Sequence, residues 1–222
     1  WTAAKMDYKR GAVFIFTLLN NIWTETQLLQ SDFVSIAINN LEEFGTAVTI
    51  RDNTLLVSSL GSKSTERVYI FNKIGDNWQQ LVHKDFVHLN INAALPDSNF
   101  AKNYGFRVDT YDDILAVSAS KTVVDTDDQS TASDEDQGSV FIYKFNNSGT
   151  YNLIQTLSDK QSKDNDEFGT SISLYRDKLA ISSLSKFTET AYPSLSVTGT
   201  ALNDISNMGK VFIYKLVNDK YI

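Results

Sequence analysis

The chain has 222 residues, a formal net charge of −7 and no cysteine, so disulfides, cysteine zinc sites and thiolate catalysis are excluded. Its acidic balance and its scattered Lys and Arg residues argue against a nucleic-acid partner, which needs clustered positive charge. No apolar stretch is long enough for a membrane span, and the 42% apolar and 12% aromatic shares are typical of a folded protein rich in strands.

The first predicted strand, GAVFIF from Gly11 to Phe16, has a pattern that returns three times along the chain. The later copies are RVYIF (Arg67 to Phe71), GSVFIY (Gly138 to Tyr143) and GKVFIY (Gly209 to Tyr214). Each copy is followed by a polar turn and then by an aromatic residue, namely Trp23, Trp78, Tyr151 or Tyr221. We therefore expect each copy to pair, through a tight turn, with a following strand that the aromatic residue opens.

A second pattern lies between these copies and begins with an aromatic-Gly pair. It runs from Glu43 to Ser59 and returns from Asn103 to Ser120 and from Glu167 to Ser183, with its aromatic residues 60 and 64 positions apart. The first half alternates with the period of a strand and ends in a short polar turn. The second half reads LLVSS, LAVSA or LAISS, and so continuous an apolar and small-residue run predicts a strand covered on both faces.

Together the two patterns predict an all-β protein in which each period forms one four-stranded antiparallel sheet, as in the blades of a β-propeller. We expect a single propeller region, with a partial blade at residues 1–41 and complete blades at residues 42–100, 101–165 and 166–222. Since this is about three and a half blades and closed propellers have roughly four to eight, we expect the sequence to be part of a longer chain with a seven-bladed ring. A second polypeptide that supplies the missing blades is the alternative. A β-sandwich would also be all-β, but it gives no reason for both patterns to repeat in register.

The aromatic-Gly pair and the GxVFIY strand resemble the FG-GAP repeat, which forms the blades of integrin α-subunit propellers and of many bacterial and protist surface proteins. The resemblance covers nearly the whole chain. It implies a non-enzymatic, secreted protein, extracellular or on the cell surface, that serves adhesion, recognition or protein assembly through the loops of its blades. Two alternatives stay open: a structural subunit of a filament, sheath or large particle, and a non-catalytic propeller module of a larger enzyme.

The chain departs from the family pattern in two ways. The small-residue GAP stretch is replaced by Ser58-Ser59-Leu60, Ser118-Ala119-Ser120 and Ser182-Ser183-Leu184. The calcium loop DxDxDG, which joins the first two strands of many integrin-like blades, is replaced by short turns with one or two carboxylates. Because calcium takes about six to eight oxygen ligands, we expect no metal at these turns.

An acidic stretch between the second and third strands of the blade at residues 101–165 is the candidate metal site. Its carboxylates are those of Asp125, Asp127, Asp128, Asp134, Glu135 and Asp136. They could hold Ca²⁺, although their spacing matches no EF-hand loop and a solvated acidic loop is the simpler interpretation. We expect that no cofactor is required. Asn146, in the sequon Asn146-Asn147-Ser148, is the candidate glycosylation site.

The long segment from Ser185 to Met208, rich in Ser and Thr, is a candidate binding loop or a packing arm against a neighbour. The expected partner is a protein or glycan ligand, or neighbouring subunits of an assembly. His83 and His88 have no third type of metal ligand near them in sequence, and GxSxG, P-loop and GxGxxG motifs are absent. We therefore expect neither a catalytic site nor enzyme activity.

Overall fold

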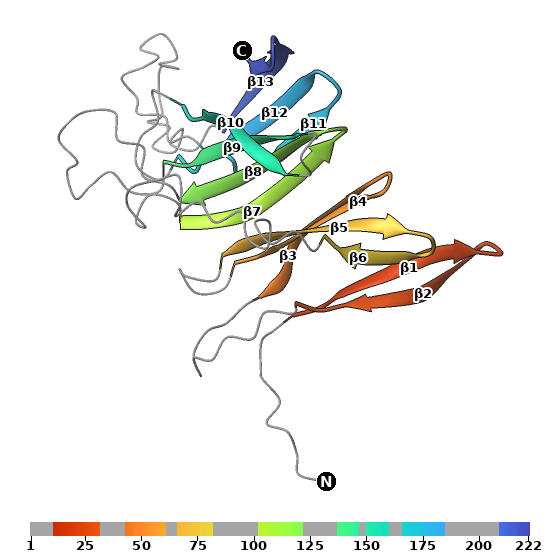
Figure 1. The fold of residues 1–222 in the computed structure, drawn as a ribbon. Coiled ribbons are helices and arrows are strands. Elements are labelled where there is room, and N and C mark those ends of the chain that lie inside the picture. The colour runs from red at the N-terminus through yellow and green to blue at the C-terminus, as the bar shows by residue number, and fades with distance from the viewer. Residues whose placement is uncertain are drawn as a thin grey trace, which may run out of the picture.

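The computed structural model describes residues 11–31, 43–60, 66–81, 102–121, 137–146, 150–159, 166–184 and 209–222 (Figure 1). Within these ranges the regular structure consists of strands, and every strand pair is antiparallel. The predicted all-β class is therefore confirmed for this part of the chain.

The strands form one hairpin and three four-stranded sheets. The hairpin comprises β1 (Val13–Leu19) and β2 (Ile22–Leu29). Sheet 1 comprises β3 (Phe44–Arg51), β4 (Thr54–Ser59), β5 (Arg67–Ile74) and β6 (Asn77–Gln80); sheet 2 comprises β7 (Lys102–Tyr111), β8 (Ile114–Lys121), β9 (Ser139–Phe145) and β10 (Tyr151–Leu157); sheet 3 comprises β11 (Ile172–Tyr175), β12 (Lys178–Ser183), β13 (Lys210–Val217) and β14 (Lys220–Tyr221). Neighbouring strands in each sheet are also neighbours in sequence, so each sheet is a simple meander.

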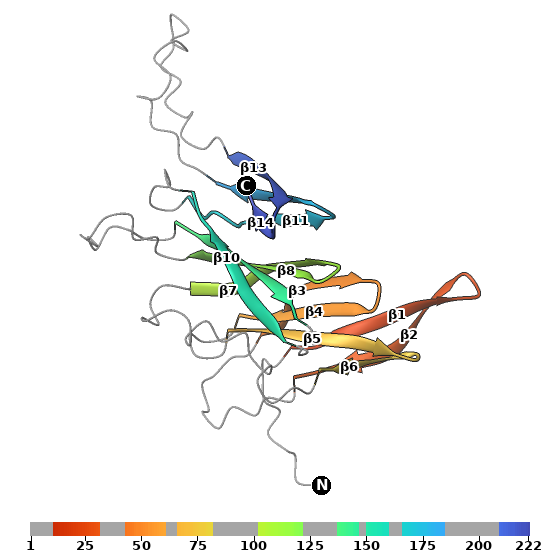
Figure 2. The ribbon, with the colours of Figure 1, turned by 45° about the horizontal axis from the view of Figure 1, so that its top comes forward.

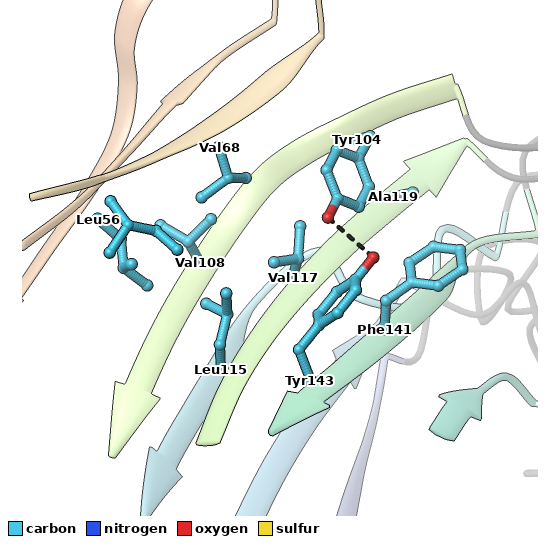
Figure 3. Close-up of a cluster of buried hydrophobic side chains, with 10 residues drawn as sticks. Leu56, Val68, Tyr104, Val108, Leu115, Val117, Ala119, Phe141 and Tyr143 are labelled. Atoms are coloured by element: carbon cyan, nitrogen blue, oxygen red, sulfur yellow. Dashed lines mark hydrogen bonds between the residues drawn. The ribbon is translucent and has the colours of Figure 1, made fainter. Parts of the chain in front are cut away.

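The sheets pack face to face in chain order, from the hairpin through sheets 1 and 2 to sheet 3 (Figure 2). Three apolar clusters fill the three interfaces. Between sheets 1 and 2, for example, Leu56 and Val68 lie against Val108, Leu115 and Val117 (Figure 3). Burial of these faces is the main driving force that holds the sheets together.

The second strand of a sheet is buried on both faces, as its continuous apolar sequence predicts. In β8, Leu115 and Val117 contribute to the cluster with sheet 1, whereas Ile114 and Ala116 contribute to the cluster with sheet 3. Strand β4 is likewise buried along almost its whole length. In β12 only alternate residues are buried, because no described sheet covers the outer face of sheet 3. The prediction is thus confirmed for β4 and β8 and wrong for β12.

The aromatic residues of the aromatic-Gly pairs occupy equivalent places in the three sheets. Phe44, Tyr104 and Phe168 are all buried, and each lies edge-on to an aromatic ring of the third strand of its own sheet. The distances between ring centroids are 5.1, 5.9 and 5.2 Å, which are typical of favourable aromatic pairs. Their predicted role as core residues is confirmed.

The glycines of these pairs allow the sheets to approach closely. Gly105 and Gly169 have φ values of +87° and +95°, which L side chains rarely adopt. A Cβ atom on either would lie 2.9 Å from the Cβ atom of Ser58 or Ser118 in the preceding sheet. The serines that stand in place of the GAP residues are therefore the small side chains on which the next aromatic-Gly pair packs.

A glutamine clamp joins the last strand of one sheet, or of the hairpin, to the last strand of the next sheet. The side chain of Gln155 in β10 donates to the backbone oxygen of Tyr221 at 2.9 Å and accepts from its backbone nitrogen at 2.8 Å. Gln27 in β2 holds Trp78 in β6 in the same way, at 2.8 and 2.7 Å. Two interfaces thus repeat one contact that the sequence patterns did not reveal.

Tyr104 and Tyr143 form a buried hydroxyl pair in the interface between sheets 1 and 2, with Tyr104 Oη donating to Tyr143 Oη at 3.0 Å (Figure 3). Burial raises the pKa of Tyr143 to about 12 and raises the pKa of Tyr104 well above its usual range. Neither hydroxyl therefore ionises readily while the protein is folded.

We expect stability to fall with rising pH between about 10 and 12, because tyrosines of the unfolded chain ionise near pH 10 while this pair keeps its protons. Tyr143 alone should contribute a loss of about 2 kcal/mol over that range. Below pH 10 both states are protonated and the pair adds no pH dependence. Urea unfolding of the double variant Tyr104→Phe/Tyr143→Phe should give a flatter alkaline profile, and since both partners are removed together its stability at pH 8 should change little. An alkaline slope identical to that of the unmodified chain would contradict the prediction.

Candidate functional site

Most of the site residues predicted from the sequence lie outside the described residues. These are Asp125, Asp127, Asp128, Asp134, Glu135, Asp136, His83, His88 and the segment from Ser185 to Met208. In the described ranges, no group of three or more His, Asp or Glu residues is arranged to hold a metal ion. The calcium site therefore stays a prediction.

Asn146 follows β9, in the connection to β10. Its backbone nitrogen donates to the Thr150 oxygen at 2.7 Å, and its side-chain oxygen accepts from the Thr150 nitrogen at 2.9 Å. These two hydrogen bonds place Asn146 at a turn, as the sequence predicts. Its glycosylation stays a prediction.

A polar cluster joins the first strands of all three sheets and is centred on Asp109 of β7. This buried carboxylate accepts hydrogen bonds from the Thr49 hydroxyl at 3.2 Å, from the Thr110 nitrogen at 2.8 Å and from the Leu174 nitrogen at 2.7 Å. Thr49 lies in β3 and Leu174 in β11. One side chain of sheet 2 therefore binds both neighbouring sheets.

Arg51, at the end of β3, extends across the same three strands. Its Nε donates to the Thr110 oxygen at 3.1 Å and its Nη2 to the Leu174 oxygen at 3.3 Å. Nη2 also lies 3.6 Å from Asp109 Oδ1, and the guanidinium stands 5.4 Å from the centre of the Tyr111 ring. The charge of Asp109 is thus partly balanced by a guanidinium that is itself fixed by two carbonyl groups.

The Arg51 contact requires the three sheets to converge at their first strands. Sheets packed in parallel layers lie about 10 Å apart, so a first and a third layer would be separated by about 20 Å, which no arginine side chain spans. Arg51 of sheet 1 nevertheless reaches the backbone of Leu174 in sheet 3. The sheets therefore lie closer together at β3, β7 and β11 than parallel layers would.

The chemistry available to this cluster is structural. Three donors and the guanidinium surround the Asp109 carboxylate, and two carbonyl oxygens hold the guanidinium. Groups held in this way are poorly placed to transfer a proton or attack a substrate. The sequence contained one signal for the cluster. Asp109 is a charged residue in the middle of a predicted strand, and the equivalent position in the first aromatic-Gly repeat is occupied by Thr49.

The two ends of the sheets differ in the length of their connections. In a meander, the turns between strands 1 and 2 and between strands 3 and 4 lie at one end, and all other connections lie at the opposite end. Most turns at the first end span only two residues, namely 20–21, 52–53, 75–76, 112–113, 176–177 and 218–219. The connection between β9 and β10, residues 146–150, is the exception. The long connections begin and end at the opposite end: residues 30–43, 60–66, 81–101, 122–138, 158–171 and 184–209.

Comparison with known proteins does not assign the chain to a family. No protein-family model matches the chain, and no curated protein matches it significantly. The resemblance to FG-GAP repeats therefore depends on the repeated sequence patterns alone. Among the described residues there is also no helix with the length and apolar character needed to cross a membrane.

Proposed function

We propose that the sheets are blades of a β-propeller of the FG-GAP type. The convergence of β3, β7 and β11 supports this arrangement, because the first strands of propeller blades surround a common axis. The repeated contacts between sheets support it as well, since the aromatic-Gly packing recurs between sheets and the glutamine clamp appears in two interfaces.

We further propose that the protein is a non-enzymatic recognition module, extracellular or on the cell surface, that binds a protein or a glycan. The observation that carries this proposal is that the strand ends joined by the long connections all lie at one end of the sheets. Binding residues are found preferentially on loops that a rigid scaffold holds in place. The opposite end has tight turns, which leave little room for a variable binding surface.

Replacement of residues 185–208 by a Gly-Ser linker of equal length tests the proposed binding surface. The unmodified chain should bind a glycan on an array, or retain a protein from an extracellular extract, and the replaced chain should lose most of that binding. A change at the opposite end, Asn20→Gly with Asn21→Gly in the turn between β1 and β2, serves as the matched control and should leave binding intact. Equal binding by all three chains, or no binding by the unmodified chain, would contradict the proposal.

A further inference from the structure

The first strand of sheet 2 contains a bulge whose backbone is held as in sheet 1. In β3 and in β7, three residues of the first strand stand opposite a single serine of the second strand. In sheet 2 these are residues 105–107, opposite Ser118, and the Arg107 nitrogen donates to the Ser118 hydroxyl oxygen at 2.9 Å. In sheet 1 the Ala47 nitrogen donates to Ser58 Oγ at the same distance. A bulge changes the direction in which its side chains point, and bulges often lie next to functional sites.

Sheet 2 differs from its neighbours in the two bulge residues that follow the aromatic-Gly pair. They are Thr46-Ala47 in sheet 1 and Thr170-Ser171 in sheet 3, but Phe106-Arg107 in sheet 2. The two threonine hydroxyls donate to the backbone oxygens of Glu43 and Glu167, at 2.7 and 2.6 Å. Phenylalanine has no hydroxyl with which to make this bond, and its ring is half-buried. Departures from a repeated local pattern are expected at functional positions.

Arg107 holds its guanidinium in one orientation. The guanidinium carbon lies 4.2 Å from the centre of the Phe106 ring, and Nη1 donates to the Phe106 backbone oxygen at 2.8 Å. The side chain is exposed, and no carboxylate of a described residue forms an ion pair with it, whereas Arg51 lies close to Asp109. Because the planar group is already oriented, it loses little conformational freedom when it binds a ligand.

The bulge lies towards the end of the sheets to which the long connections attach. The register between β7 and β8 places it closer to Lys102 and Lys121, where the connections 81–101 and 122–138 attach, than to the turn at 112–113. Sheets 1 and 3 cover the two faces of sheet 2, so the exposure of Arg107 does not come from an uncovered sheet. Arg107 is therefore available at the end of the molecule where we propose that recognition takes place.

A guanidinium stacked on an aromatic ring suits a ligand in which a carboxylate is joined to a compact group with C–H bonds. Arginine binds a carboxylate through two parallel N–H···O bonds, and the exposed part of the ring offers an apolar contact beside them. The net charge of −7 opposes a ligand with dense negative charge, such as a nucleic acid or a strongly acidic protein surface. It tolerates a sugar chain in which single carboxylates are separated by neutral groups.

We propose that Phe106 and Arg107 form a binding site for an acidic sugar, that is, a sugar residue that carries a carboxylate. The guanidinium binds the carboxylate, and the exposed part of the Phe106 ring contacts the C–H groups of the sugar. This inference rests on the proposed function, because it names the ligand class for the recognition surface at the long connections.

Binding of labelled oligosaccharides tests the inference. The probes are oligogalacturonate, hyaluronan fragments and sialyllactose, each compared with a form in which the carboxyl group has been reduced to an alcohol. The unmodified chain should bind at least one acidic probe and should bind its reduced form at least about tenfold more weakly. Phe106→Thr with Arg107→Ala gives sheet 2 the bulge residues of sheet 1, so this double variant should fold. It should bind the acidic probe at least about tenfold more weakly than the unmodified chain.

Two further variants separate geometry from charge. Arg107→Lys keeps the positive charge but not the planar pair of donors, so it should also weaken binding of the acidic probe. Arg176→Gln is the matched control, because Arg176 is an exposed arginine that lies 5.2 Å from the centre of the Tyr175 ring, in a tight turn at the opposite end of the sheets. It should leave binding of the acidic probe unchanged.

Three outcomes would overturn the inference. The first is that the chain binds none of the acidic probes, and the second is that it binds acidic and reduced forms equally well. The third is that the double variant binds the acidic probe as tightly as the unmodified chain does. If a neutral glycan or a protein is bound instead, and the double variant retains that binding, the inference fails while the proposed function stands. The replacement of residues 185–208 tests the proposed function separately.

Discussion

Gly138→Ala should destabilise the protein by at least about 3 kcal/mol, as measured by urea unfolding. Gly138 has a φ of +88°, and a Cβ atom at this position would collide with the backbone nitrogen and oxygen of Phe168. The two segments lie this close because the Phe168 nitrogen donates to the Gln137 oxygen at 2.8 Å. An added methyl group must therefore separate sheets 2 and 3 or break that hydrogen bond.

Gly75→Ala is the matched control for this prediction. Gly75 also has a positive φ, +62°, but no atom lies within 4 Å of the place where its Cβ would stand. The substitution should cost only the backbone strain of an alanine in the left-handed region, about 1 to 2 kcal/mol. Equal losses for the two variants would mean that the close approach of the sheets at Gly138 contributes nothing.

Asp109→Asn should reduce stability by about 2 to 4 kcal/mol. Asparagine has the size of aspartate, but one of its two terminal atoms is an NH₂ group. That group must face the nitrogen of Leu174 or the donors at the other oxygen, Thr49 and Thr110. At least one buried N–H or hydroxyl donor then loses its acceptor, and the Arg51 guanidinium loses the opposite charge beside it.

Asp177→Asn is the control for the loss of a carboxylate. Asp177 lies in the turn between β11 and β12, where Lys178 forms an exposed ion pair with it at 3.0 Å. The neighbouring Lys178 lowers the pKa of Asp177, but solvent screens the pair and its loss should have little effect on stability. If Asp109→Asn were equally mild, the cluster would not hold the three sheets together.

Sequence repetition was sufficient to predict the strands and their assignment to sheets. The alternation in FGTAVTI, the continuous apolar run in LLVSS and the GxVFIY pattern each correspond to one strand position in a meander. These features are local, because side-chain periodicity and turn residues are set by neighbours along the chain. The burial of Phe44, Tyr104 and Phe168 followed from their recurrence at one position.

Contacts between sheets could not be predicted in the same way. Arg51 reaches Leu174 across 123 positions of sequence, and Gln155 reaches Tyr221 across 66. Both side chains bind backbone atoms, which every residue has. The residue types of Leu174 and Tyr221 therefore do not identify them as the partners of Arg51 and Gln155. The wrong prediction for β12 has a similar origin, because its sequence resembles that of β8 but nothing described covers its outer face.

Two distances between spin labels test the central claim, that the sheets converge at their first strands. The chain has no cysteine, so labels can be placed on introduced cysteines alone. Asn53→Cys with Asp177→Cys labels the turns after the first strands of sheets 1 and 3. Asp76→Cys with Lys220→Cys labels the residue just before β6 and the first residue of β14, where the fourth strands of the same sheets begin. The first pair should be clearly closer together than the second, whereas equal distances would show parallel layers and contradict the account.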